Sequence, residues 1–401
     1  MTADPMTHSA ADAVPTVLFV VFQTENRANG GVESITQVIE NLHGVAPVVL
    51  TQADTPAAER WRRAGAAVHV RPMGGGGRAA RAAGLVRANL MVRRLVKETG
   101  ATVVHCNDIR ALQHAAPGAR AAGASVVFNI RDVKPPAETY GAQWRLAQLA
   151  DRILVLSKEM QAALRARLPG ALPGTRASTP VEFIYSIVDP AVMRPLPAEE
   201  RAALRRRLGM AEDEVAVGYV ATVNAKKGQL EFLEGAGEAL RTRLPNARLH
   251  LVGDFRPERD AYARRCQEAV GRLGLEGQVA FHGYRSGVAE WYQACDIVLL
   301  ASRREGLARC MIESLACGTP VVSFDVCSAR EILDGHDCGR VARQGDYAGL
   351  AASLAELATD AALRARLGEN GAGAARRLFS PAPVAAAYVR LYRALSGGAA
   401  V

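Results

Sequence analysis

The sequence comprises 401 residues with a formal net charge of +9; 49% of the residues are apolar and only 5% are aromatic. This length is sufficient for two α/β domains that each bury a core. The apolar fraction argues against a disordered or fibrous protein. No apolar run approaches the roughly 20 residues of a membrane-spanning helix.

The N-terminal segment and the cysteines bear on the compartment. Residues 1–15 contain no Lys or Arg, and the apolar stretch 17–22 is too short for a signal-peptide core, so we interpret it as a first strand. The seven cysteines form no CxxC pair, and several lie within apolar strand or helix patterns. They predict buried thiols in a reducing cytoplasm, with neither a disulfide framework nor a zinc site.

The positive charge is concentrated in one stretch. Residues 51–150 contain 15 Lys plus Arg against 6 Asp plus Glu, which accounts for the whole excess. Within this stretch, basic and apolar side chains interleave over residues 78–97 on a predicted helix. Such a helix either exposes an ordinary charged face or makes peripheral contact with the inner face of the membrane. No nucleic-acid partner is expected, because no recognition module accompanies the charge.

In the first half of the chain, apolar strands alternate with helical patterns, which predicts a parallel sheet with helices on both faces. Gly30 and Gly31 follow the first strand and begin a helix that extends to about Leu42. Paired glycines at such a position allow a ligand to approach the backbone N–H groups. The strand candidates here are 16–22, 48–50, 67–71, 102–105, 125–128 and 152–156.

The second half repeats this pattern. A Pro-containing linker at 189–197 places the boundary between the halves near residue 190, and a final amphipathic helix is predicted over 384–396. The second-half strand candidates are 215–220, 247–252, 278–281, 296–300 and 320–324.

The segment 302–322, SRREGLARCMIESLACGTPVV, is the most informative part of the sequence. It follows a buried strand and places Glu305 before a helix that starts near Ala308, with Glu313 one to two turns inside that helix. Eight residues of helical rise are roughly 12 Å, enough for two carboxylates to reach opposite ends of an extended ligand. The helix N-terminus between them favours a diphosphate. Taken alone, the two glutamates also fit ordinary solvated helix positions.

This segment resembles the retaining GT-B glycosyltransferases of family 4 (glycosyl transferases group 1), whose pattern is S-x-x-E-G-x(6)-E-x-x-A-x-G-x-P-V-V. The resemblance implies an α/β GT-B fold, in which two Rossmann-like doubly wound domains face each other across a cleft. Residues 1–190 would then bind the acceptor and residues 191–380 the nucleotide-sugar donor. Residues 381–401 would form a helix that crosses back to the first domain.

The resemblance also assigns roles within the motif. It implies that Glu305 contacts the donor sugar and that Glu313 contacts the nucleotide ribose. The backbone of Gly306, Leu307 and Ala308 would lie near the sugar and the diphosphate.

Two further loops match the family in part. Gly30 and Gly31 correspond to a glycine loop that faces the donor diphosphate and the acceptor. Lys227 matches the lysine of a G-R-x(4)-K-G loop that neutralises the diphosphate. The arginine position of that loop holds Thr222, so Lys226 or an arginine elsewhere has to supply the second cation.

Other candidate positions follow strands. The family commonly has a histidine after the fifth strand of the first domain, and here Asn129 or Arg131 takes its place. Tyr284 and Arg285 are candidates for contact with the nucleobase. His105, which ends a strand, either lines the cleft or is a hydrogen-bonded structural histidine. The candidate catalytic residues are therefore Glu305, Lys227, Asn129 and Arg131.

The implied activity is transfer of a hexosyl group, with retention, from a nucleotide diphosphate-sugar to a saccharide or lipid-linked hydroxyl acceptor in polysaccharide or glycolipid synthesis. The sequence contains no Asp-x-Asp, which favours metal-independent chemistry, and no cofactor is expected. Two alternatives stay open. One is a nucleotide-sugar epimerase or hydrolase. The other is a non-catalytic nucleotide-binding partner subunit, which the Thr222 replacement and the missing histidine keep open.

Overall fold

The structure is a computed structural model that describes residues 14–22, 30–73, 78–132, 142–167 and 179–397; within these ranges, the side chains of 78–80 and 142–144 are not described. The chain divides into two compact units, residues 1–187 with 381–401, and residues 188–380. We refer to them as unit 1 and unit 2. The C-terminal helix thus belongs to the same unit as the N-terminal half of the chain.

Unit 1 is a parallel sheet of seven described strands in the order β3-β2-β1-β4-β5-β6-β7. Its strands are β1 (Thr16–Val21), β2 (Ala46–Thr51), β3 (Ala67–Val70), β4 (Val103–Cys106), β5 (Ser125–Asn129), β6 (Arg152–Val155) and β7 (Val181–Phe183). Its helices are α1 (Gly30–Asn41), α2 (Pro56–Arg63), α3 (Arg78–Thr99), α4 (Ile109–Ala121), the short η1 (Ala142–Leu149), α5 (Lys158–Arg167) and α13 (Pro381–Ser396).

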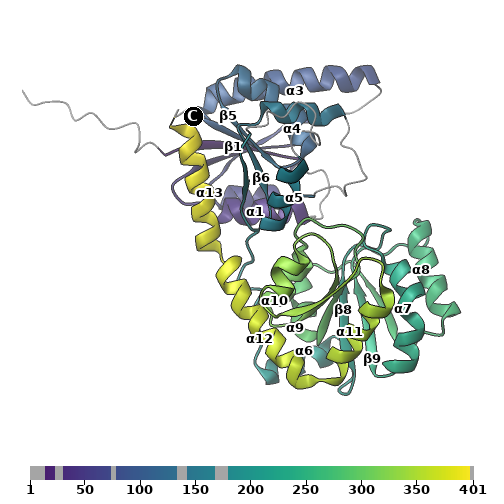
Figure 1. Cartoon of the computed structure of the whole chain (residues 1–401). Helices are drawn as coiled ribbons and strands as arrows, with labels where there is room; N and C mark the ends of the chain where they lie inside the picture. The colour runs from purple at the N-terminus through teal and green to yellow at the C-terminus, as the bar shows by residue number, and fades with distance from the viewer. Residues whose placement is uncertain (1–13, 23–29, 74–77, 133–141, 168–178, 398–401) are drawn as a thin grey trace, which may run out of the picture. The chain divides into compact units, whose positions relative to one another are not determined.

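Helices cover both faces of this sheet (Figure 1). On one face, α1, α2 and α13 pack over side chains of β1, β4, β5 and β6 in a single apolar cluster. On the other face, α3 packs on α4. Trp61 of α2 is fully buried and donates from Nε1 to Thr36 Oγ1 of α1 at 2.8 Å. Helix α13 is fastened to the sheet by Tyr392, whose hydroxyl lies 2.9 Å from His105 Nδ1.

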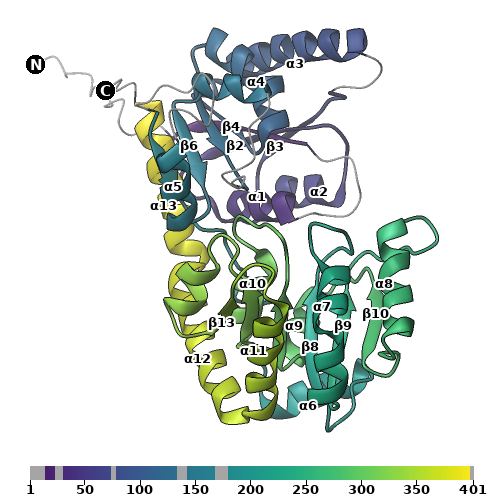
Figure 2. The same ribbon diagram turned by 45° about the vertical axis from the view of Figure 1, so that its right-hand side comes forward.

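Unit 2 is a parallel sheet of six described strands in the order β10-β9-β8-β11-β12-β13. Its strands are β8 (Val215–Val220), β9 (Ala247–Val252), β10 (Val279–Gly283), β11 (Ile297–Leu300), β12 (Val321–Phe324) and β13 (Gly339–Ala342). Its helices are α6 (Ala198–Arg207), α7 (Gln229–Arg243), α8 (Ala261–Arg272), α9 (Val288–Ala294), α10 (Arg309–Ala316), the short η2 (Arg330–Asp334), α11 (Tyr347–Thr359) and α12 (Ala361–Leu378). Helices α7, α8 and α11 form one layer, and α6, α9, α10 and α12 form the other (Figure 2).

The predicted parallel sheets with helices on both faces are confirmed. Most predicted strands are found within one or two residues of their expected ends, but β7 and β13 were not predicted. Each is only three or four residues long and carries an Arg or Glu in its short run. Pairing with β6 and β12 makes them strands, so tertiary context decides their conformation. All seven cysteines are free thiols; six of them are buried, and Cys327 is partly exposed.

Candidate functional site

The strand order of unit 2 reverses between β8 and β11, which are hydrogen-bonded neighbours. In an open parallel sheet, ligands bind beyond the carboxyl ends of the strands at such a switch point. The loop after β8 contains Thr222 and Lys227, and the loop after β11 contains Glu305 and Gly306. The structure therefore brings together, at one edge of the sheet, two motifs that lie far apart in the sequence.

A backbone contact holds these two loops together. The N–H of Arg303 donates to the carbonyl of Lys226 at 2.9 Å. Gly228 has φ +77°, and a Cβ at this position would lie 2.4 Å from the carbonyl oxygen of Ala301. Only glycine accommodates both the left-handed backbone and the close approach. Asn224 shapes the same loop because its Oδ1 accepts from the N–H groups of Lys226 and Lys227.

The central feature of the site is an ion pair between Lys227 and Glu305. Lys227 Nζ lies 2.6 Å from Glu305 Oε1, and the side chains are 24% and 9% exposed. Tyr219 supports the lysine by donating its hydroxyl to the Lys227 carbonyl. The pair neutralises both charges, so an anion that approaches Lys227 shares the ammonium with Glu305. Ser302, at the start of the same motif, is fully buried, and its hydroxyl has no partner among the described residues.

The second motif carboxylate, Glu313, is also paired with a cation. Its Oε1 lies 2.6 Å from Arg309 Nη2, and both side chains are largely buried. Arg309 is the first residue of α10 and follows Ala308, which provides no side-chain cap. An uncapped helix N-terminus beside a guanidinium is suited to an anion. Sequence reasoning did not single out Arg309; its position four residues before Glu313 on a helix was the available signal.

Cys310 lies between these two ion pairs, but it is no candidate nucleophile. Burial raises the pKa of its thiol to about 12, and the charges of Glu305 and Glu313 act in the same direction. The thiol therefore stays neutral near pH 7, whereas nucleophilic cysteines require a thiolate.

The predicted nucleobase contacts lie beyond β10. Tyr284 is 43% exposed, and Arg285 is also exposed. The loop after β9 lies close to the loop after β8, because a Cβ at Gly253 would meet the carbonyl oxygen of Ala221 at 2.0 Å. Gly253 also donates its N–H to the carbonyl of Gly283 at 3.0 Å, which connects the ends of β9 and β10. An exposed aromatic ring and a guanidinium thus follow β10, whose end is joined through Gly253 to the loop after β9, next to the loop that contains Lys227.

The candidate residues of unit 1 gather at their own switch point, between β1 and β4. Gly30 and Gly31 open α1, and the loop that precedes them, 23–29, lies outside the described residues. Asn107, which follows β4, donates from Nδ2 to the Gly31 carbonyl at 3.4 Å, and its buried Oδ1 has no described partner. Sequence reasoning did not include Asn107 in the site.

The two residues proposed to replace the family's histidine differ in accessibility. Asn129 ends β5 and is 1% exposed, with a buried Oδ1 that has no described partner. Arg131 is half-buried and donates from Nη2 to the Gly30 carbonyl at 3.4 Å. Of the two, Arg131 has the side chain that a substrate is able to reach.

His105 is a structural histidine. It is fully buried among Phe19, Tyr388 and Tyr392, and Nδ1 is hydrogen-bonded to the Tyr392 hydroxyl. Burial first, and the charge of Arg131 second, lower the pKa of His105 to about 3. The neutral ring therefore fastens α13 to the sheet of unit 1.

The basic region forms helix α3, as predicted. Val86 and Leu90 lie one turn apart on it and are 61% and 59% exposed. Arg87, Arg93 and Lys97 are exposed around them. In the described part of the chain, no helix is both long and apolar enough to cross a bilayer. Nor do the described residues contain a cluster of three His, Cys, Asp or Glu side chains placed to hold a metal ion.

Two parallel sheets, each with its switch point lined by glycine loops and polar side chains, define the GT-B fold class. Solved structures share this fold. HepE (Alr3699) of Anabaena, crystallised with UDP-glucose, superposes with a TM-score of 0.79 at 21% identity, covering 94% of this chain and 99% of that protein. Sucrose-phosphate synthase of Thermosynechococcus elongatus gives a TM-score of 0.78 at 19% identity, covering 95% of this chain and 99% of that protein.

Sequence comparison points to a particular family for unit 2. Residues 200–373 match the family described as "Glycosyl transferases group 1". The putative glycosyltransferase EpsD of Bacillus subtilis is 30% identical over 201 residues, 50% of this chain and 51% of that protein. D-inositol 3-phosphate glycosyltransferase 2 of Catenulispora acidiphila is 33% identical over 273 residues, 65% and 60% of the two chains. The chain spans about half the length of the first curated relatives it matches.

Proposed function

We propose that this protein is a retaining, metal-independent glycosyltransferase of family 4 that moves a hexosyl group from a nucleotide diphosphate-sugar to a hydroxyl acceptor. The observation that carries the proposal is the meeting of Lys227, Glu305 and the N-terminus of α10 at the switch point of unit 2. The match of residues 200–373 to the group 1 family and the sugar-nucleotide complexes of HepE support it. Unit 2 would bind the donor and unit 1 the acceptor.

The proposed chemistry is electrostatic. As the sugar C1–O bond to the diphosphate weakens, negative charge develops on the leaving oxygens. Lys227 and the N–H groups at the start of α10 would stabilise that charge. The carboxylate of Glu305 would move from the lysine to the hydroxyls of the sugar, and the ammonium would then bind the phosphate. The leaving diphosphate itself would accept the proton of the acceptor hydroxyl, so no strong protein base and no cofactor are required.

Arg309 is the best candidate for the cation that is missing at Thr222. Its guanidinium lies at the first turn of α10, where a diphosphate would sit, and Glu313 holds it in place at 2.6 Å. Glu313 would then both bind the ribose and orient Arg309. In unit 1, Arg131 would take the place of the family's histidine near the reacting carbon, since Asn129 is buried.

The acceptor is proposed to be a saccharide or a lipid-linked saccharide at the cytoplasmic face of a membrane. The observation that favours the lipid-linked case is helix α3, where exposed Val86 and Leu90 are surrounded by basic side chains. This combination is typical of helices that lie on anionic membrane surfaces. Synthesis of a cell-surface polysaccharide or glycolipid would follow.

A donor panel tests the proposal. Thermal unfolding is measured with UDP-, GDP-, ADP- and TDP-sugars, because a bound donor stabilises the folded protein by mass action. One nucleotide class should raise the melting temperature, and both Glu305→Gln and Glu313→Ala should abolish that rise. Glu199→Gln, an exposed carboxylate of α6, is the matched control and should retain it. Absence of a shift with every donor would refute the proposed donor site.

Acceptor and mechanism are tested next with the donor so identified. Release of nucleoside diphosphate that depends on an acceptor and persists in EDTA supports a metal-independent transferase, and NMR of the product reports the anomeric configuration. Donor binding without release would instead identify a non-catalytic partner subunit. Formation of a new sugar from donor alone would identify an epimerase.

A further inference from the structure

Unit 2 contains a cavity of about 540 Å³ that lies apart from the proposed donor site. Asp296 and Pro320 line it, and these residues immediately precede β11 and β12. The cavity therefore lies at the amino ends of the strands, whereas the Glu305 motif follows their carboxyl ends. One face of α12 and the linker before α6 form its other walls.

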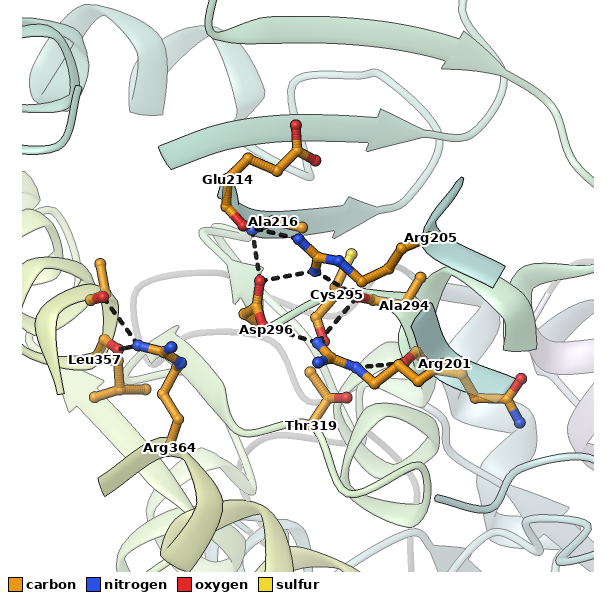
Figure 3. A network of polar contacts seen from close by, with 12 residues as sticks. Arg201, Arg205, Glu214, Ala216, Ala294, Cys295, Asp296, Thr319, Leu357 and Arg364 are labelled. Atoms are coloured by element: carbon orange, nitrogen blue, oxygen red, sulfur yellow. Dashed lines mark hydrogen bonds and ion pairs between the residues drawn. The ribbon is translucent and has the colours of Figure 1, made fainter. Parts of the chain in front are cut away.

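The cavity wall at the sheet is a closed ion-pair network (Figure 3). Asp296 accepts from Arg201 Nη2 at 2.8 Å through Oδ1, and from Arg205 Nη1 at 2.9 Å and the Ala216 N–H at 2.8 Å through Oδ2. These donors hold the pKa of the Asp296 carboxyl below its ordinary value against the opposing effect of burial. With two guanidinium groups on one carboxylate, the network carries a net positive charge.

Arginine N–H groups remain unused on several sides of this cavity. Arg201 and Arg364 both line it, and Figure 3 shows them on separate elements of the fold. Arg364 donates only through Nη1, to the carbonyls of Leu357 and Ala358 at the end of α11. Its Nε and Nη2 have no partner among the described residues. Arg376, 12 residues or just over three turns further along α12, lines the cavity with a guanidinium that makes no bond to any described residue.

The hydrogen-bond acceptors around the cavity are largely satisfied. The C-terminal carbonyls of α10 face this region, but Ser314 O already accepts from the N–H groups of Cys317 and Thr319, and Leu315 O accepts from Gly318 N–H. Besides Asp296, one other lining carboxylate is described, the exposed Glu369. The cavity thus offers mostly donors and positive charge.

We propose that this cavity binds a small organic phosphate, separately from the nucleotide-sugar. A tetrahedral phosphate dianion is able to accept from guanidinium groups on more than one side, and Arg201 lines the cavity from α6 while Arg364 and Arg376 line it from α12. Inorganic phosphate alone would leave much of the space empty, since a water molecule in the liquid takes up about 30 Å³ and pockets for small organic ligands run from about 300 to 1,000 Å³. Leu196, Pro195 and Ala365 offer an apolar wall to the body of such a ligand.

Isothermal titration with glycerol 3-phosphate, at constant ionic strength and with glycerol as the phosphate-free control, tests the proposal. Binding of glycerol 3-phosphate but not glycerol is expected, and Arg376→Ala should weaken it at least tenfold. Arg376 is exposed and makes no bond in the described structure, so its removal should leave the fold intact. Arg377→Ala, the exposed neighbour that does not line the cavity, should change the affinity by less than twofold.

The same titration on Lys227→Ala separates this cavity from the proposed donor site. Undiminished binding in Lys227→Ala together with loss in Arg376→Ala would support the proposal. Loss in Lys227→Ala with full binding in Arg376→Ala would show that the phosphate binds at the β8–β11 switch point and would overturn it. No binding to the unsubstituted protein at millimolar concentration would overturn it as well. Because the readout needs no nucleotide-sugar, these outcomes do not depend on the proposed transferase activity.

Discussion

Gly228→Ala should destabilise unit 2 far more than an ordinary glycine substitution in a turn. The residue has φ +77°, and the new Cβ would lie 2.4 Å from the carbonyl oxygen of Ala301, where real contacts require 3.0 Å or more. The left-handed backbone costs about 1–2 kcal/mol for alanine. Separating the two loops would add about 1–3 kcal/mol, as overpacking does elsewhere, and would weaken the bond between Arg303 N–H and the Lys226 carbonyl. We expect a total of about 2–5 kcal/mol.

Gly209→Ala is the matched control, because it has φ +72° and no atom within 4 Å of the new Cβ. It carries the backbone cost without the collision, so about 1–2 kcal/mol is expected. Urea unfolding followed by tryptophan fluorescence, to which the buried Trp291 contributes the signal of unit 2, measures both. For a domain of this size, the difference corresponds to a melting temperature lower by several degrees in Gly228→Ala. Equal losses in the two variants would refute the close approach of the Lys227 and Glu305 loops.

Three further outcomes are expected. The pKa of His282 is lowered to about 4, chiefly by burial. The unfolded chain therefore binds the proton more readily, and the stability of unit 2 should fall as pH drops from about 6.5 to about 4. His282→Gln should flatten this pH dependence, and an unchanged pH dependence would argue against a lowered pKa at His282. Lys227→Met should lower the free energy of unfolding in urea by about 2 kcal/mol, because the lysine is 24% exposed and loss of one partner from a fully buried pair costs ~3–5 kcal/mol. Adding Glu305→Gln should restore at least half of the lost stability. Simple additivity of the two substitutions would rule out the ion pair. Leu90→Asp should reduce sedimentation of the protein with anionic lipid vesicles severalfold. Val192→Asp, which changes an exposed apolar position of unit 2, should not reduce it. Equal binding of both variants to the vesicles would exclude membrane contact through α3.

The parts of the site that could be predicted from sequence are those held in one continuous segment. The spacing of Glu305 and Glu313 around a helix start near Ala308 was visible in the sequence, and α10 indeed begins at Arg309. Lys227 was recognisable only through the resemblance of its loop to the G-R-x(4)-K-G loop of the family. A buried strand, a loop and a helix start have local signals, so their order along the chain survives folding.

What could not be predicted is how the charges of that segment are paired. The salt bridge between Lys227 and Glu305 joins residues 78 positions apart, and it depends on β8 and β11 being neighbours. The role of Asn107 at the Gly31 carbonyl depends in the same way on the pairing of β1 with β4. The choice between Asn129 and Arg131 turns on burial, which no single-residue pattern reveals.

The sequence by itself determined the alternation of strands and helices, hence two parallel sheets, and the presence of the motif at 302–322. These follow from hydrophobic periodicity and from glycine and proline positions, which act over a few residues. Only the tertiary structure decided the strand order and the cavity lined by Arg201, Arg364 and Arg376. Those features arise where elements distant in the chain bury surface against one another, and no local pattern encodes which partners meet.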